Sequence, residues 1–124
     1  MLENVFSQYL KDLQNTLTRG DAREESFYGC LEKMLLAYAE ASGKKKIAVT
    51  TLPKATDAGN PDFRVWDGKN HITGYIEAKA PQHQALDPIS TSEQLKRYLG
   101  TFPNLILTNF YEFRLYQHGL FVSS

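Results

Sequence analysis

The sequence predicts an α/β domain in which helices flank a mixed central sheet, with a pair of helices at the N-terminus. Apolar residues recur at three- and four-residue spacing over residues 2–38, which is the periodicity of amphipathic helices. From residue 47 the pattern changes to short runs rich in β-branched and aromatic residues, which are typical of strands. One further helical stretch interrupts these runs at residues 92–99, so the expected element order is α, α, β, β, β, α, β, β.

The two N-terminal helices are predicted from their apolar faces and their end signals. The first helix is expected to end near Gly20. For the second helix, Asp21 is the expected N-cap, with Glu24 three positions later as its capping-box partner, and Gly43 is the expected stop. The apolar face of the first helix consists of Leu2, Val5, Phe6, Tyr9, Leu10, Leu13 and Leu17.

Strands are expected over residues 47–52, 61–66, 71–79, 105–108 and 112–116, with residues 120–122 as a last short strand or stub. The second and third strands should form a hairpin, because Asp67-Gly68-Lys69-Asn70 between them is typical of a tight turn. The third helix is expected to have Ser90 or Thr91 as its cap and Gly100 as its terminator.

Length and composition limit the possible classes of protein. A chain of 124 residues with 42% hydrophobic residues is the size of one domain, and its net charge is zero, with 14 basic and 14 acidic residues. A neutral domain is expected to bind nucleic acid only through a local patch or with the help of another domain. No segment predicts a membrane span or a secretory signal, so a cytoplasmic location is expected. The single cysteine, Cys30, excludes an internal disulfide and the usual kinds of zinc site.

The hairpin brings charged residues together. If Asp67 and Asn70 close the turn, Asp62 lies opposite Tyr75, and Asp62, Glu77 and Lys79 share one face of the hairpin because side chains alternate along a strand. Asp62 and Glu77 would then be diagonal neighbours. The other face should be a core face, and it carries Phe63, Val65, Ile72, Ile76 and Ala78.

Two converging carboxylates beside a lysine suit a hard divalent cation, Mg²⁺ before Zn²⁺, that engages a phosphate group. The chemistry that this set favours is phosphodiester hydrolysis, with Lys79 orienting water or stabilising the transition state. An alternative from the residues alone is that Asp62 begins a strand for turn reasons, and that Glu77 and Lys79 belong to a solvated strand face.

Several short motifs resemble the PD-(D/E)xK nuclease superfamily, including the Q-x-x-x-Y element of its RecB-like branch. More closely, the chain looks like the N-terminal nuclease domain of single-chain restriction-modification enzymes. The resemblance covers roughly residues 20–119. The motifs that carry it are Arg23-Glu24-Glu25-Ser26-Phe27, Gly59-Asn60-Pro61-Asp62-Phe63, Gly74-Tyr75-Ile76-Glu77-Ala78-Lys79, Ser92-Glu93-Gln94-Leu95-Lys96-Arg97-Tyr98 and Pro103-Asn104-Leu105-Ile106-Leu107-Thr108-Asn109.

The resemblance implies a restriction-endonuclease-like core and assigns roles to individual residues. Asp62 and Glu77 would be metal ligands and Lys79 the catalytic lysine, while Gln94 and Tyr98 would flank the site from a helix. Glu24 would be an acid near the metal. Glu25 competes with Glu24 for that role, and a plain helix cap is the alternative for Glu24; packing alone would explain Tyr98.

These inferences together predict a Mg²⁺-dependent endonuclease domain that acts on double-stranded DNA. Residues 1–124 would be a single domain at the N-terminus of a longer restriction-modification enzyme, followed by methyltransferase, helicase or target-recognition domains. Two alternatives stay open: a non-catalytic DNA-binding or scaffold domain of the same fold, and a stand-alone repair or junction nuclease. The neutral charge fits the last of these poorly.

Overall fold

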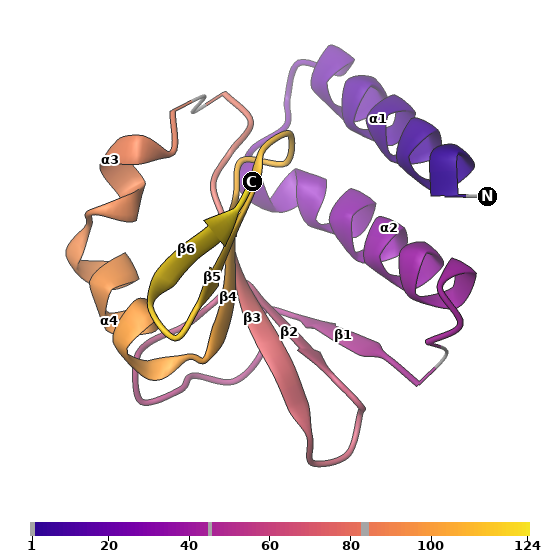
Figure 1. Ribbon diagram of the computed structural model, residues 1–124. Coiled ribbons are helices and arrows are strands. Elements are labelled where there is room, and N and C mark those ends of the chain that lie inside the picture. Colours follow the sequence, from indigo (N-terminus) through magenta and orange to yellow (C-terminus); the bar gives the residue numbers. More distant parts are fainter. Residues whose placement is uncertain (1, 45, 83–84) are drawn as a thin grey trace.

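The computed structural model describes residues 2–44, 46–82 and 85–124, and its elements are drawn in Figure 1. The helices are α1 (Leu2–Thr18), the 3₁₀ helix η1 (Glu24–Phe27), α2 (Tyr28–Ala41), α3 (Asp87–Ser90) and α4 (Glu93–Thr101). The strands are β1 (Ala48–Thr51), β2 (Phe63–Trp66), β3 (Ile72–Ala78), β4 (Asn104–Thr108), β5 (Phe113–Gln117) and β6 (Leu120–Ser123).

The strands form one sheet in sequence order, from β1 to β6. The β3–β4 pair is parallel and the other pairs are antiparallel, so the crossover that a parallel pair requires carries α3 and α4. Figure 1 shows α1 and α2 on one side of the sheet and α3 and α4 on the other. This mixed sheet with helices on both faces confirms the predicted α/β class. Among the described helices, none is long and apolar enough to cross a membrane.

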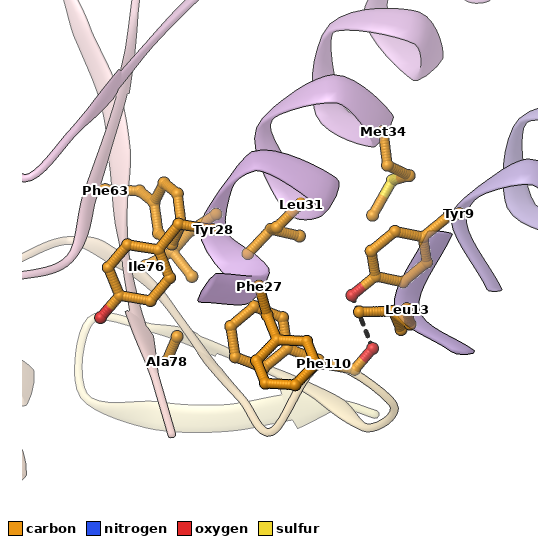
Figure 2. Packing of buried hydrophobic residues seen from close by; sticks show 10 residues of the cluster. All are labelled: Tyr9, Leu13, Phe27, Tyr28, Leu31, Met34, Phe63, Ile76, Ala78 and Phe110. Atoms are coloured by element: carbon orange, nitrogen blue, oxygen red, sulfur yellow. Dashed lines mark hydrogen bonds between the residues drawn. The ribbon is translucent and has the colours of Figure 1, made fainter. Parts of the chain in front are cut away.

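The first core lies between the N-terminal helices and the sheet. It gathers Tyr9, Leu13, Phe27, Tyr28, Leu31, Met34, Phe63, Ile76, Ala78 and Phe110 (Figure 2). Phe63 and Ile76 are paired across β2 and β3, so these two strands present their apolar side chains to α2. The Tyr9 hydroxyl donates a hydrogen bond of 2.6 Å to the buried Phe110 carbonyl, which joins α1 to the loop after β4.

The second core lies on the other face of the sheet, beneath α4. Its buried residues are Ala58, Leu86, Leu95, Tyr98, Phe102, Leu105, Leu107 and Tyr116. Leu105 and Leu107 point to this face, whereas Ile106 packs against the first core, so β4 is covered on both sides as its continuous apolar run predicts.

Two predicted helix starts are wrong. Asp21 caps no helix: the chain first forms η1, where the Arg23 N–H donates to Ser26 Oγ at 3.1 Å, and α2 begins only at Tyr28. For α4, neither Ser90 nor Thr91 is the N-cap residue. The cap is Ser92, whose Oγ accepts a hydrogen bond from the Leu95 N–H at 3.2 Å, because Ser90 already belongs to α3.

The same helix does not stop at Gly100. It continues to Thr101, and Phe102 is its C-cap residue. The Phe102 side chain is buried in the second core, and this packing offsets the low helix propensity of Gly100.

The predicted hairpin register is wrong by two residues. The turn closes between the Asp67 N–H and the His71 carbonyl at 3.0 Å rather than at Asn70, which adds one residue to the turn. A β-bulge between Val65 and Trp66 adds the second, so Phe63 pairs with Ile76. A shift of two residues keeps every side chain of the regular part on its predicted face. Ile72, beyond the bulge, is 42% exposed and lies outside the core.

Gly74 on β3 is required by the close approach of the neighbouring strand. A Cβ atom at this position would lie 2.9 Å from the backbone carbonyl oxygen of Asn104 in β4. We expect Gly74→Ala to lower the free energy of unfolding by about 1–3 kcal/mol in urea denaturation, because two paired strands would have to separate locally. The matched control is Gly29→Ala in α2, where no atom lies within 4 Å; this variant should be neutral or more stable by up to about 1 kcal/mol. Equal stability of the two variants would contradict the prediction.

Candidate active site

Asp62 and Glu77 lie next to each other on the α4 side of the hairpin. The Asp62 N–H donates to the Ile76 carbonyl at 3.1 Å, which continues the β2–β3 register by one residue. Asp62 therefore lies directly opposite Glu77, whereas the predicted register placed the two residues diagonally. The corrected register brings the two carboxylates closer than the sequence indicated.

The Asp62 carboxylate is held by two hydrogen bonds. Tyr28 donates its hydroxyl to Asp62 Oδ1 at 2.8 Å, and the backbone N–H of Ala78 donates to Asp62 Oδ2 at 2.8 Å. One bond comes from helix α2 and the other from the end of β3, so the carboxylate is fixed in orientation. Each oxygen still has a free lone pair with which it can contact a ligand.

Glu77 is buried but incompletely satisfied. The residue is 4% exposed, and its Oε2 atom forms an ion pair of 3.2 Å with Lys79 Nζ. Its other oxygen, Oε1, is buried and has no hydrogen-bond partner. Leaving such an atom unpaired costs about 1–3 kcal/mol, and more for a charged group. Glu77 Oε1 is therefore available as an acceptor for a ligand.

The surroundings of Glu77 differ from the open polar face that the sequence predicted. Glu77 pairs with Leu107 of β4, whose side chain belongs to the second core, so helix α4 covers this part of the sheet. The carboxylate lies at the border of that core, and the side chain of its ion-pair partner Lys79 is partly exposed to solvent. Lys79 is fixed through its backbone, because its N–H donates to the Thr108 carbonyl at 2.8 Å.

Burial raises the pKa values of both carboxyls, and the charge of Asp62 adds to the shift of Glu77. Burial, and then the charge of Asp62, raise the pKa of Glu77 to about 8, although Lys79 opposes the shift. Burial also raises the pKa of Asp62, against the hydrogen bonds from Ala78 and Tyr28, the charge of Lys79, and the hydrogen bond that Glu77 donates to Asp62 when Glu77 is protonated. Two adjacent acids whose pKa values stay raised in spite of a neighbouring lysine are typical of functional sites.

Glu24, rather than Glu25, is the acid beside this pair. Tyr28 donates its hydroxyl to Glu24 Oε2 at 3.1 Å as well as to Asp62, while Glu25 is exposed. Sequence reasoning missed Tyr28. The available signal was its position four residues after Glu24, which places both on one helix face. The pKa of Tyr28 is raised by burial and by the Asp62 and Glu24 charges, so its hydroxyl stays a donor.

Gln94 and Tyr98 lie on the α4 face that covers the site. The Gln94 amide donates to the Tyr98 hydroxyl at 3.3 Å, and Tyr98 is fully buried in the second core. Burial and the charges of Glu77 and Asp62 raise the pKa of Tyr98 to about 12, which reflects its proximity to the carboxylates. Tyr98 also packs on the backbone of Gly59, where an added Cβ would lie 3.3 Å from the ring.

The donor set fits a hard cation through two of the three predicted ligands. Asp62 and Glu77 offer adjacent carboxylate oxygens, one of them the unpartnered Oε1, and such oxygens are the ligands that Mg²⁺ prefers. The Tyr28 hydroxyl contacts both Glu24 and Asp62. Across the described ranges, no three His, Cys, Asp or Glu side chains gather closely enough to hold a metal ion by themselves. A bound Mg²⁺ commonly keeps several waters, so two protein ligands are compatible with it.

Comparison with known proteins supports the fold. No family model and no curated protein matches the chain. A chain in a cryo-EM structure of a DrdV–DNA complex is similar to it with a TM-score of 0.78 and 23% sequence identity. The similarity covers 99% of this chain and 12% of that chain. It supports the restriction-endonuclease-like α/β fold predicted from the sequence, and this chain corresponds to only a small part of the larger protein.

Proposed function

We propose that this chain is a Mg²⁺-dependent DNA endonuclease domain of the PD-(D/E)xK type, belonging to a longer restriction-modification enzyme. The observation that carries the proposal is the buried Glu77 carboxylate with its unpartnered Oε1, adjacent to Asp62 and ion-paired to Lys79. These are the residues of the P-D and E-x-K motifs. The similarity to a chain of a DNA complex favours DNA as the substrate.

Asp62 and Glu77 would hold the ion, which supplies a bound water of lowered pKa and neutralises charge on the scissile phosphate. Tyr28 and the Ala78 N–H keep the Asp62 carboxylate oriented for this purpose. Lys79 is 28% exposed at its side chain, so its ammonium can leave Glu77 and contact a phosphate oxygen where negative charge develops. Glu24, linked to Asp62 through Tyr28, adds negative charge that favours cation binding.

The second candidate is a non-catalytic DNA-binding or scaffold domain of the same fold. A scaffold would gain stability by replacing Glu77 with an apolar residue, because a buried acid with one oxygen unpaired is costly. Retention of this acid together with Asp62 and Lys79 therefore favours the enzyme. A stand-alone nuclease is less favoured, since the chain has no basic excess with which to bind DNA alone.

The test uses the full-length protein and a long plasmid or phage DNA, because a long DNA contains many different short sequences that could serve as the cleavage target. We expect cleavage with Mg²⁺, no cleavage with EDTA, and recovery when Mg²⁺ is added in excess over the chelator. Cleavage that persists in EDTA would contradict the metal requirement. DNA binding without cleavage in any divalent cation would favour the scaffold.

A further inference from the structure

Arg64 lies on the same face of the hairpin as the carboxylate pair. It follows Asp62 by two residues on β2 and pairs with Tyr75 of β3, just as Asp62 lies opposite Glu77. Two residues along a strand span about 6.5 Å, so Arg64 is one side-chain position from the candidate metal site. No motif or spacing in the sequence singles out this arginine.

The guanidinium group of Arg64 contacts two aromatic rings rather than an acid. Its central carbon lies 5.3 Å from the centroid of the Trp66 ring and 5.9 Å from that of the Tyr75 ring, both within cation–π distance. Tyr75 in turn stacks on Phe102, with ring centroids 4.2 Å apart. The Trp66 indole is fixed by a hydrogen bond of 2.9 Å to Thr50 Oγ1. The side chain is therefore oriented before any ligand arrives.

Among the described residues, none is a polar partner of Arg64. Its Nε atom is buried without a hydrogen bond, and none of the ion pairs between described residues includes Arg64. Within the described part of the chain, the only other buried side-chain atom in this condition is Glu77 Oε1. One unpartnered donor and one unpartnered acceptor thus occur on the same face of one hairpin, as expected where a cation and an anion bind side by side.

We propose that Arg64 is a DNA-positioning residue that binds a backbone phosphate next to the scissile one. The planar fork of N–H donors matches phosphate oxygens, and the contacts with the aromatic rings leave these donors without a hydrogen-bond partner among the described residues. Fixing a neighbouring phosphate would align the scissile bond with Asp62, Glu77 and Lys79. This inference rests on the proposed function, because it takes DNA as the substrate of the site.

The test measures DNA binding in EDTA, where no cleavage occurs. The full-length protein is titrated onto a labelled duplex of mixed sequence over a series of salt concentrations. We expect Arg64→Met and Arg64→Gln to raise Kd roughly tenfold at low salt, and to reduce the slope of log K against log salt by about one. The matched control is Arg19→Met, which removes the same charge from an exposed position after α1, and it should bind like the unmodified protein.

A second measurement uses the unmodified protein, so that it does not depend on the folding of a variant. Phenylglyoxal modifies accessible arginines, and mass spectrometry reads each site. Duplex DNA should protect Arg64 and leave Arg19 reactive. Equal reactivity of Arg64 with and without DNA, or equal Kd values for the Arg64 and Arg19 variants, would overturn the inference. Mg²⁺-dependent cleavage by the same preparation would still leave the proposed function in place, whereas a protein that neither binds nor cuts DNA would overturn both.

Discussion

Glu77→Gln should reduce Mg²⁺-dependent DNA cleavage by at least about 100-fold while the protein stays folded. The amide has the same shape as the carboxyl, but it removes the negative charge that faces the cation and replaces one of the two acceptor oxygens with an N–H₂ donor. Lys79, which loses its ion-pair partner, is partly exposed and can be solvated. Asp62→Asn and Lys79→Met should lower the rate by a similar factor, measured as the initial rate of DNA cleavage by the full-length protein.

Metal binding separates the roles of these residues. In calorimetric titration with Mg²⁺, Asp62→Asn and Glu77→Gln should bind the ion more weakly, whereas Lys79→Met should still bind it. The controls are Glu40→Gln and Lys11→Met, which remove the same groups from exposed positions on α2 and α1. Full cleavage activity in all three site variants would remove the nuclease hypothesis and leave the scaffold.

In EDTA, the free energy of unfolding should fall as the pH rises from about 5 to 8. Glu77 has a folded-state pKa of about 8 against an ordinary value of 4.5, so within this window the folded protein holds a proton that the unfolded chain has released. Unfolding then releases a proton, and stability decreases by up to about 1.4 kcal/mol per pH unit. The raised pKa of Asp62 acts in the same direction.

The measurement is the urea midpoint at several pH values, with and without Mg²⁺. Glu77→Gln should flatten the profile, and Glu40→Gln should leave its slope unchanged. Mg²⁺ should restore stability at pH 8, because it replaces the proton as the compensating charge. A profile that rises with pH in EDTA would show that the Glu77 carboxylate is stabilised, rather than destabilised, by its surroundings.

The sequence was sufficient for the α/β class and for the face on which the charged residues lie, although it did not predict η1 or α3. Period-two alternation places Asp62 and Glu77 on one side of the hairpin whatever even shift the register takes, so the pair survives the error of two residues. The register itself depends on the Val65–Trp66 bulge and on the extra residue in the Asp67–His71 turn. Neither leaves a pattern in hydrophobicity.

Contacts between distant elements explain what the sequence did not reveal. Tyr28 joins Glu24 to Asp62, and Asp62 lies 34 residues after Tyr28 in the chain. Such a contact depends on how α2 packs on the sheet. The burial of Glu77 depends on α4, which closes over β3. Arg64 has an ordinary local sequence, and only the approach of Trp66 and Tyr75 distinguishes it.

The parallel pairing of β3 and β4 sets an order for folding during synthesis. Hairpin β2–β3 can form once residue 78 has left the ribosome, because its contacts are local. The backbone N–H of Lys79 finds its acceptor, the Thr108 carbonyl, only after about 30 more residues have been added. Glu77 likewise gains its neighbour Leu107 only when β4 is present, so a nascent chain would have no assembled cleavage site until β4 has emerged.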